Sequence, residues 1–326
     1  MSHAHVLVHD AKRERLWAVA RWTAFLAVPV LLAFLMASPE RALTTLWYVV
    51  IPVLPATFFL SPALWRGICP LATLNELGNR IGTQRALSPK MAAVLGTAGL
   101  VLFHVMVPGR RVLFNQDGSA LVITVALVGV LAVVLGAVWS VRSAFCNALC
   151  PVLPVELLYG HAPLVSLQRG RCTTCTVCTP RGCLDLSEQK TIFQVLGPAR
   201  RTNAWLLTPF GIFIGALPGF VLGYSLLSDG PLATAGHVYL TTLGYSLLSY
   251  IVTVVLVMGL KLKVSKAILL LATAAGGLYY WFAGPAIATQ LGVSESVSLA
   301  IRVVGIGVVA IWFVRTLRRH VAQGGI

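Results

Sequence analysis

Eight apolar runs, each close to the length of a membrane-spanning helix, constrain this chain more than any other feature of its sequence. They cover approximately residues 16–37, 43–61, 91–107, 120–140, 204–227, 237–259, 267–283 and 298–314. A helix of about 20 apolar residues crosses the hydrocarbon core of a bilayer. Because 57% of the residues are hydrophobic and 11% are charged, the sequence predicts an all-α, polytopic membrane protein with about eight transmembrane helices.

The net charge of +15 is distributed unevenly between the two sides of this topology. If the first span starts inside, the loops on the far side contain Arg41, Arg110 and Arg111, whereas most of the 25 lysines and arginines lie on the near side. The positive-inside rule then predicts that both termini are cytoplasmic, in a bacterial cytoplasmic (inner) membrane. Basic residues placed in this way indicate contact with a lipid bilayer and argue against a nucleic-acid partner.

Four cysteines between the fourth and fifth runs predict a metal centre. Cys172, Cys175, Cys178 and Cys183 are spaced C-x2-C-x2-C-x4-C. Three thiolates at equal short intervals let one loop surround a corner of an iron–sulfur cube. Zinc sites also use four cysteines, but they normally pair two C-x2-C knuckles, whereas here a third cysteine follows at the same interval. The pattern favours a [4Fe–4S] cluster over zinc, in a small cytoplasmic iron–sulfur loop domain.

The other three cysteines belong to two similar Cys–Pro turns. Cys146 and Cys150 stand four residues apart, on one face of a helix, and Pro151 follows the second. Cys69 precedes Pro70 in the same way after the first two spans. This order predicts a degenerate repeat that brings Cys69, Cys146 and Cys150 together at the inner surface around a pseudo-twofold axis. In the alternative interpretation, each cysteine is only a small apolar residue at a helix end.

In this alignment Trp65 pairs with Cys146, and Glu76 falls within one residue of Glu156. The number of clusters depends on how the thiols are shared, because seven cysteines cannot supply eight ligands. Cys150 could complete a site with Cys172, Cys175 and Cys178 while Cys183 serves elsewhere, as in two-cluster ferredoxins. Either one cluster exists and three cysteines are left over, or a second cluster is held by Cys69, Cys146 and others together with one ligand that is not cysteine. The candidates for this ligand are His161, Glu156 and Asp185.

Two histidines in the spans are candidates for a haem or a quinol site. His104 lies in the outer part of the third span, and His237 lies at the outer end of the sixth. Polar groups inside a membrane are costly and commonly functional, although histidines at such positions also occur simply as interfacial residues. The fifth run carries glycines at four-residue intervals from Gly211 to Gly223, which predicts close approach by another helix.

The segments FCNALCP and WRGICP resemble the turns of membrane-bound polyferredoxin-like proteins of the NapH, NosR and CcoG kind, in which C-x3-C-P follows a transmembrane helix. The resemblance covers about residues 40–190. It implies a redox role, either in passing electrons between membrane quinol and redox partners or in assembling metalloenzymes. Unlike several relatives, this chain has Trp65 at the position of one cysteine and a single C-x2-C-x2-C run.

The sequence divides into a cytoplasmic tail, a four-helix membrane half with the degenerate repeat, a cytoplasmic iron–sulfur segment, a second four-helix membrane half and a second cytoplasmic tail. Their bounds are residues 1–15, 16–145, 146–203, 204–314 and 315–326. The predicted function is electron transfer between a membrane partner, either the quinol pool or a haem, and a redox partner subunit. Because no residue stands out as a nucleophile or general acid, we expect a subunit of an oxidoreductase complex rather than a catalyst acting alone. One alternative is an assembly factor for a respiratory metalloenzyme. The other is a membrane transporter or structural subunit whose cysteine loop binds zinc.

Overall fold

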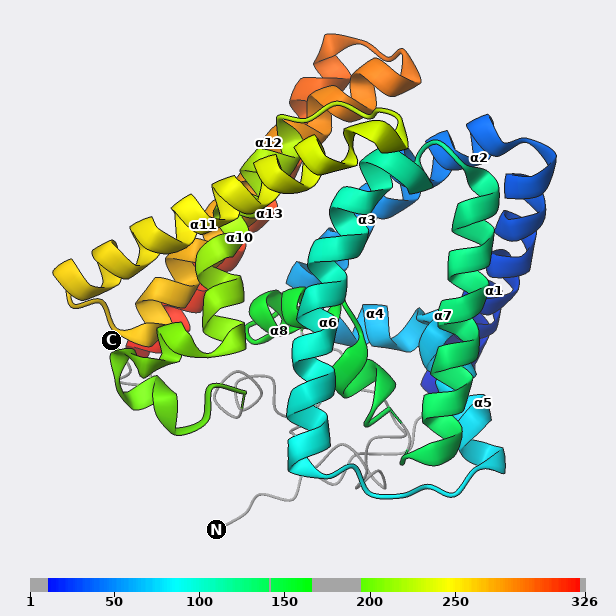
Figure 1. Ribbon diagram of the computed structural model, residues 1–326, viewed down its shortest axis with the longest axis horizontal. Helices are drawn as coiled ribbons and strands as arrows, with labels where there is room; N and C mark the ends of the chain where they lie inside the picture. Colours follow the sequence, from blue (N-terminus) through cyan, green and yellow to red (C-terminus); the bar gives the residue numbers. More distant parts are fainter. Residues whose placement is uncertain (1–10, 141, 166–194, 323–326) are drawn as a thin grey trace.

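The computed structural model describes residues 11–140, 142–165 and 195–322, and most of these residues are helical (Figure 1). No strand occurs within these ranges. Seven helical segments in the described chain are long and apolar enough to cross a membrane: Arg15–Ala37, Pro39–Leu60, Pro89–Phe114, Gly118–Val138, Leu232–Gly259, Val264–Leu291 and Glu295–Arg319. The all-α polytopic membrane architecture expected from the apolar runs is therefore confirmed.

The predicted fifth span is shorter than its apolar run. Helix α10 covers only Pro209–Ser225, because Thr208 accepts a hydrogen bond from the Gly211 amide (3.0 Å) and so caps the helix at this point. The preceding residues form the 3-10 helices η6 (Gly197–Arg201) and η7 (Asn203–Leu207). Most of α10 is buried inside the protein, so its apolar residues meet other helices rather than lipid.

Two consecutive parts of the chain repeat the same order of elements. The first repeat, residues 11–81, consists of α1 (Ala11–Ala37), α2 (Pro39–Thr45), η1 (Leu46–Val50), α3 (Ile51–Leu60), α4 (Pro62–Ile68) and α5 (Pro70–Ile81). The second, residues 89–160, consists of α6 (Pro89–Gly109), η2 (Arg110–Phe114), α7 (Gly118–Val138), η3 (Phe145–Leu149) and α8 (Leu153–Gly160). Here η1, η2 and η3 are π-helical. Each repeat has two long spans, a short helix, a Cys–Pro turn and another short helix.

The two repeats exchange their last short helices. Helix α5 of the first repeat packs against α7 of the second, and α8 of the second packs against α3 of the first. The chain after each short helix adds a matching backbone contact, from the Thr83 amide to the Ala137 carbonyl (2.7 Å) and from the Leu164 amide to the Phe59 carbonyl (2.9 Å). Such reciprocal packing is what a pseudo-twofold axis parallel to the spans produces.

The C-terminal half lies along one side of the two repeats (Figure 1). It contains α10, η8 (Leu232–Thr234), α11 (Ala235–Gly259), α12 (Val264–Leu291) and α13 (Glu295–Ala322). The glycine face of α10 lies directly against α11, and a Cβ atom on Gly219 would sit 2.0 Å from the Tyr245 carbonyl oxygen. The predicted close approach is therefore confirmed. Trp312 joins the halves by donating to the Tyr159 carbonyl (3.1 Å).

Candidate functional site

Cys69 and Cys150 occupy equivalent positions in two helix–proline–helix turns. Cys69 ends α4 and precedes Pro70, the first residue of α5, whereas Cys150 ends η3 and precedes Pro151. Their backbone angles nearly coincide, with φ −58° and ψ 119° at Cys69 and φ −56° and ψ 121° at Cys150. The residue before a proline is sterically driven out of the helical region. Each Cys–Pro pair therefore ends one short helix and redirects the chain into the next.

These turns lie deep in the helical body, beside the middle of two long helices. Gly99, in the middle of α6, directly faces the carbonyl of Leu149, the residue before Cys150. Leu74 of α5 contacts Gly129 in the middle of α7. Cys69 precedes Leu74 by more than one helical turn, at the beginning of α5. Short helices can end inside the helical body here because the surrounding helices bury their ends.

The three described thiols share one cavity. Cys146 lies one turn before Cys150 on η3, and Cys69, Cys146 and Cys150 are half-buried and all line this cavity. Burial raises the pKa of Cys146 to about 12, and the nearby Arg142 and Arg66 oppose this only in part. Within the described part of the chain, no three His, Cys, Asp or Glu side chains are placed to hold a metal ion. A second cluster at these cysteines therefore stays a prediction.

Buried charges connect the repeats beside these thiols. Arg66 of the first repeat donates to Glu156 of the second (2.5 Å), and also to Asn147 (3.0 Å). In the second link the glutamate belongs to the first repeat: Glu76 accepts a hydrogen bond from Arg142 of the second repeat. It also accepts one from Arg21 of its own repeat (2.7 Å). Each repeat thus supplies an arginine and a glutamate to the other. The two glutamates, which the alignment of the Cys–Pro turns places within one residue of each other, therefore each form an ion pair between the repeats.

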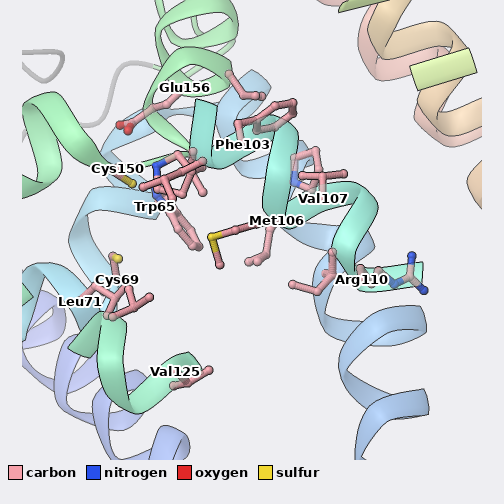
Figure 2. A pocket seen from close by; sticks show the side chains of 18 of the residues that line it. Trp65, Cys69, Leu71, Phe103, Met106, Val107, Arg110, Val125, Cys150 and Glu156 are labelled. Carbon is pink, nitrogen blue, oxygen red and sulfur yellow. The ribbon is translucent and has the colours of Figure 1, made fainter. Parts of the chain in front are cut away.

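A cavity of about 1230 Å³ extends from the cysteines toward the opposite end of the spans. Figure 2 shows Cys69 and Cys150 at one end of this cavity and Arg110 at the other, with Met106 projecting between them. Its wall is mostly apolar and is formed by both repeats together with α10 and α12. Trp65, which replaces a cysteine in the alignment, also lines it. The cavity can therefore hold an apolar molecule next to the thiols.

Several predicted ligands lie elsewhere or have other partners. Cys172, Cys175, Cys178, Cys183 and Asp185 fall outside the described residues. The two remaining candidates for a non-cysteine ligand, Glu156 and His161, are buried; Glu156 pairs with Arg66, and the His161 Nδ1 atom lies 2.6 Å from the Leu158 carbonyl oxygen. Neither side chain is directed to a metal site in the described chain.

The two candidate histidines for a haem or quinol site do not face each other. The His104 Nδ1 atom lies 2.8 Å from the Leu100 carbonyl oxygen, and its ring packs against Phe213 and Phe220 of α10. His237 is exposed at the beginning of α11. Tyr239, two residues later, donates to the Val105 carbonyl of α6 (2.7 Å), so His237 points to a different side of α11.

Sequence reasoning missed the residues at the far end of the cavity. Arg110 and Arg111 served only as topology markers, yet Arg111 donates to Asp229 (2.8 Å) and to the Tyr224 carbonyl (2.9 Å). Arg110 lies over the rings of Trp47 and Tyr48. Two adjacent arginines at the end of an apolar run were the available signal. Their partners come from distant parts of the chain, so the sequence could not identify the cluster.

In comparisons with known proteins, no family model matches this sequence, and neither a curated protein nor a solved structure shows significant similarity to the chain.

Proposed function

We propose that this protein is an integral membrane iron–sulfur electron-transfer protein, passing electrons between a membrane partner and a redox partner subunit. The observation that carries the proposal is the C-x2-C-x2-C-x4-C run from Cys172 to Cys183. Four thiols within twelve residues fit the corners of a cube better than the paired knuckles of a zinc site. A bound [4Fe–4S] cluster would supply one-electron redox chemistry that the side chains lack.

The attachment of the cysteine-rich segment supports this proposal. The chain enters the segment from Val165, whose amide donates to the Leu60 carbonyl (2.8 Å), and leaves it next to the buried Leu196. Both ends are therefore held against the helical body. The cysteine-rich segment is too short to form an apolar core of its own. A bound metal centre is one of the few features that can stabilise a fold in so short a segment.

Charge around the segment supports a redox role for it. Arg169, Arg171 and Arg181 lie within three residues of a cysteine of the run. Positive side chains near a cluster favour its more negative, reduced state and so raise its reduction potential. The proposed electron path runs between a membrane partner and the cysteine-rich segment.

Metal and sulfide analysis of protein purified without oxygen tests this proposal. We expect about four irons and about four acid-labile sulfides per chain, with an electron paramagnetic resonance signal after dithionite reduction. Cys175→Ser should lose most of the iron, because it removes a thiolate from the run of four. Cys146→Ser is the matched control, since this thiol lies outside that run, and it should retain the iron.

Two results would overturn the proposal or its ligand assignment. Zinc without sulfide would exclude electron transfer through this segment and would favour a structural zinc site. If Cys175→Ser kept its full iron content, the cysteine run would not be the ligand set.

A further inference from the structure

Two buried polar groups in the wall of the cavity lack partners in the described structure. The Nε and Nη2 atoms of Arg110 are buried and have no hydrogen-bond partner among the described residues. The same holds for the hydroxyl of Tyr280, whose side chain lies on α12 with 6% of the residue exposed. Both residues line the cavity. A buried donor without an acceptor is costly, so such groups point to a missing ligand.

Among the described residues, the far end of the cavity also carries more positive than negative charge. Asp229 accepts hydrogen bonds from Arg111 (2.8 Å), Tyr48 (3.3 Å) and Asn115. Arg110 donates through Nη1 to the neutral hydroxyl of Tyr224 (2.8 Å), and its Cζ atom lies 4.9 Å from the Trp47 ring centroid. Two guanidinium groups therefore share one carboxylate here. Contact with aromatic rings offsets only part of the cost of burying the second charge.

The rest of the cavity suits an acyl chain. Its wall is almost entirely apolar between Arg110 and the level of Gly99, a length of about 16 Å along α6 at 1.5 Å per residue. Val130 and Val134 of α7 line the cavity and are also 61% and 49% exposed. The cavity therefore opens at the surface that faces lipid. A chain can enter it sideways from the bilayer without crossing the polar cluster.

We propose that this cavity binds an anionic phospholipid, with its phosphate next to Arg110 and one acyl chain extending toward Cys69 and Cys150. A phosphate supplies both the acceptor oxygens that the guanidinium lacks and the negative charge that the cluster lacks. A neutral head group, such as that of a quinone, supplies an acceptor but leaves the charge uncompensated. The charge balance therefore favours phospholipid. This inference does not depend on the metal content of the protein.

Native mass spectrometry of the delipidated full-length protein, titrated separately with phosphatidylglycerol and phosphatidylcholine, tests this site. We expect one tightly bound phosphatidylglycerol, preferred at least about fivefold over phosphatidylcholine, the ratio given by roughly 1 kcal/mol for one cation near an anionic lipid. Arg110→Gln should remove this preference. Arg302→Gln is the matched control and should keep it, because Arg302 also lies over an aromatic ring, 4.6 Å from the Trp281 centroid, but does not line the cavity.

A second variant tests the acyl chain separately from the head group. Val125 lines the cavity (Figure 2), so Val125→Trp should fill it and weaken the binding of both phospholipids while Arg110 stays in place. Size-exclusion profiles confirm that each variant is folded. Equal lipid preference in wild type and Arg110→Gln would overturn the proposal. So would an equal loss in Arg302→Gln, or displacement of the phospholipid by an equimolar amount of ubiquinone.

Discussion

Breaking the ion pair between Arg66 and Glu156 tests whether the two repeats are held together by buried charge. The side chains are 8% and 4% exposed, and their charged groups are 2.5 Å apart. Arg66→Met leaves the Glu156 carboxylate buried and removes the hydrogen bond from Arg66 to Asn147. Removing one partner of a buried pair typically costs about 3–5 kcal/mol. We expect a loss of this size in the free energy of unfolding.

The double variant provides the decisive measurement. Arg66→Met combined with Glu156→Met removes both charges, and replacing a whole buried pair by well-packed hydrophobic residues of similar volume is often close to neutral in stability. We therefore expect the double variant to be about as stable as wild type, which gives a coupling energy of at least about 3 kcal/mol. Unfolding by sodium dodecyl sulfate in mixed micelles, followed by circular dichroism, measures these differences.

The pair between Arg21 and Glu76 serves as the control. It is more accessible, with side chains 17% and 21% exposed, and Arg142 also pairs with Glu76. Arg21→Met should therefore cost no more than about 1 kcal/mol. If Arg66→Met costs as little as Arg21→Met, or if the two changes at Arg66 and Glu156 are simply additive, the argument for a charge-linked interface between the repeats is wrong.

Two further predictions concern helix packing and thiol chemistry. Gly219→Leu should lower the free energy of unfolding by about 1–3 kcal/mol or more, because the new Cβ atom would clash with the Tyr245 carbonyl. Gly236→Leu is the control: a Cβ atom there would have no atom within 4 Å, so this change should have little effect on the unfolding midpoint. Because burial raises the pKa of Cys146 to about 12, its alkylation by iodoacetamide in metal-free protein should accelerate about tenfold per pH unit from pH 7 to 10. An ordinary thiol would instead level off near pH 9, and such a plateau at Cys146, detected by peptide mass spectrometry, would contradict the buried environment.

The deep position of the Cys–Pro turns in the helical body is a feature that a hydropathy profile does not reveal. Hydropathy identifies segments long enough to cross a membrane, and residues 62–81 and 145–160 contain only short helices. Such segments are assigned to loops by length. In the structure α5 and α8 enter the helical body because each packs on a span of the other repeat. That packing depends on two contacts far apart in sequence, which a hydropathy profile does not contain.

The sequence by itself determined the membrane class, the approximate positions of the spans and the repetition of the Cys–Pro turn. These features follow from local properties, namely apolar run length and the steric effect of proline on the residue before it. It also predicted that the glycine face of α10 packs closely against another helix, because glycines at regular intervals have no side chains that would hold the two backbones apart.

Only the tertiary structure decided which charges pair, where Cys69, Cys146 and Cys150 lie and which residues line the cavity. Arg66 pairs with Glu156, which lies 90 residues away in the sequence, and Arg111 pairs with Asp229, which lies 118 residues away. Neither partner is specified by its neighbours in sequence, because a buried charge is satisfied by whichever opposite charge the packing of the helices brings to it. The position of Arg110 follows from the same packing: within the described part of the chain, two arginines adjacent in sequence meet a single carboxylate in space.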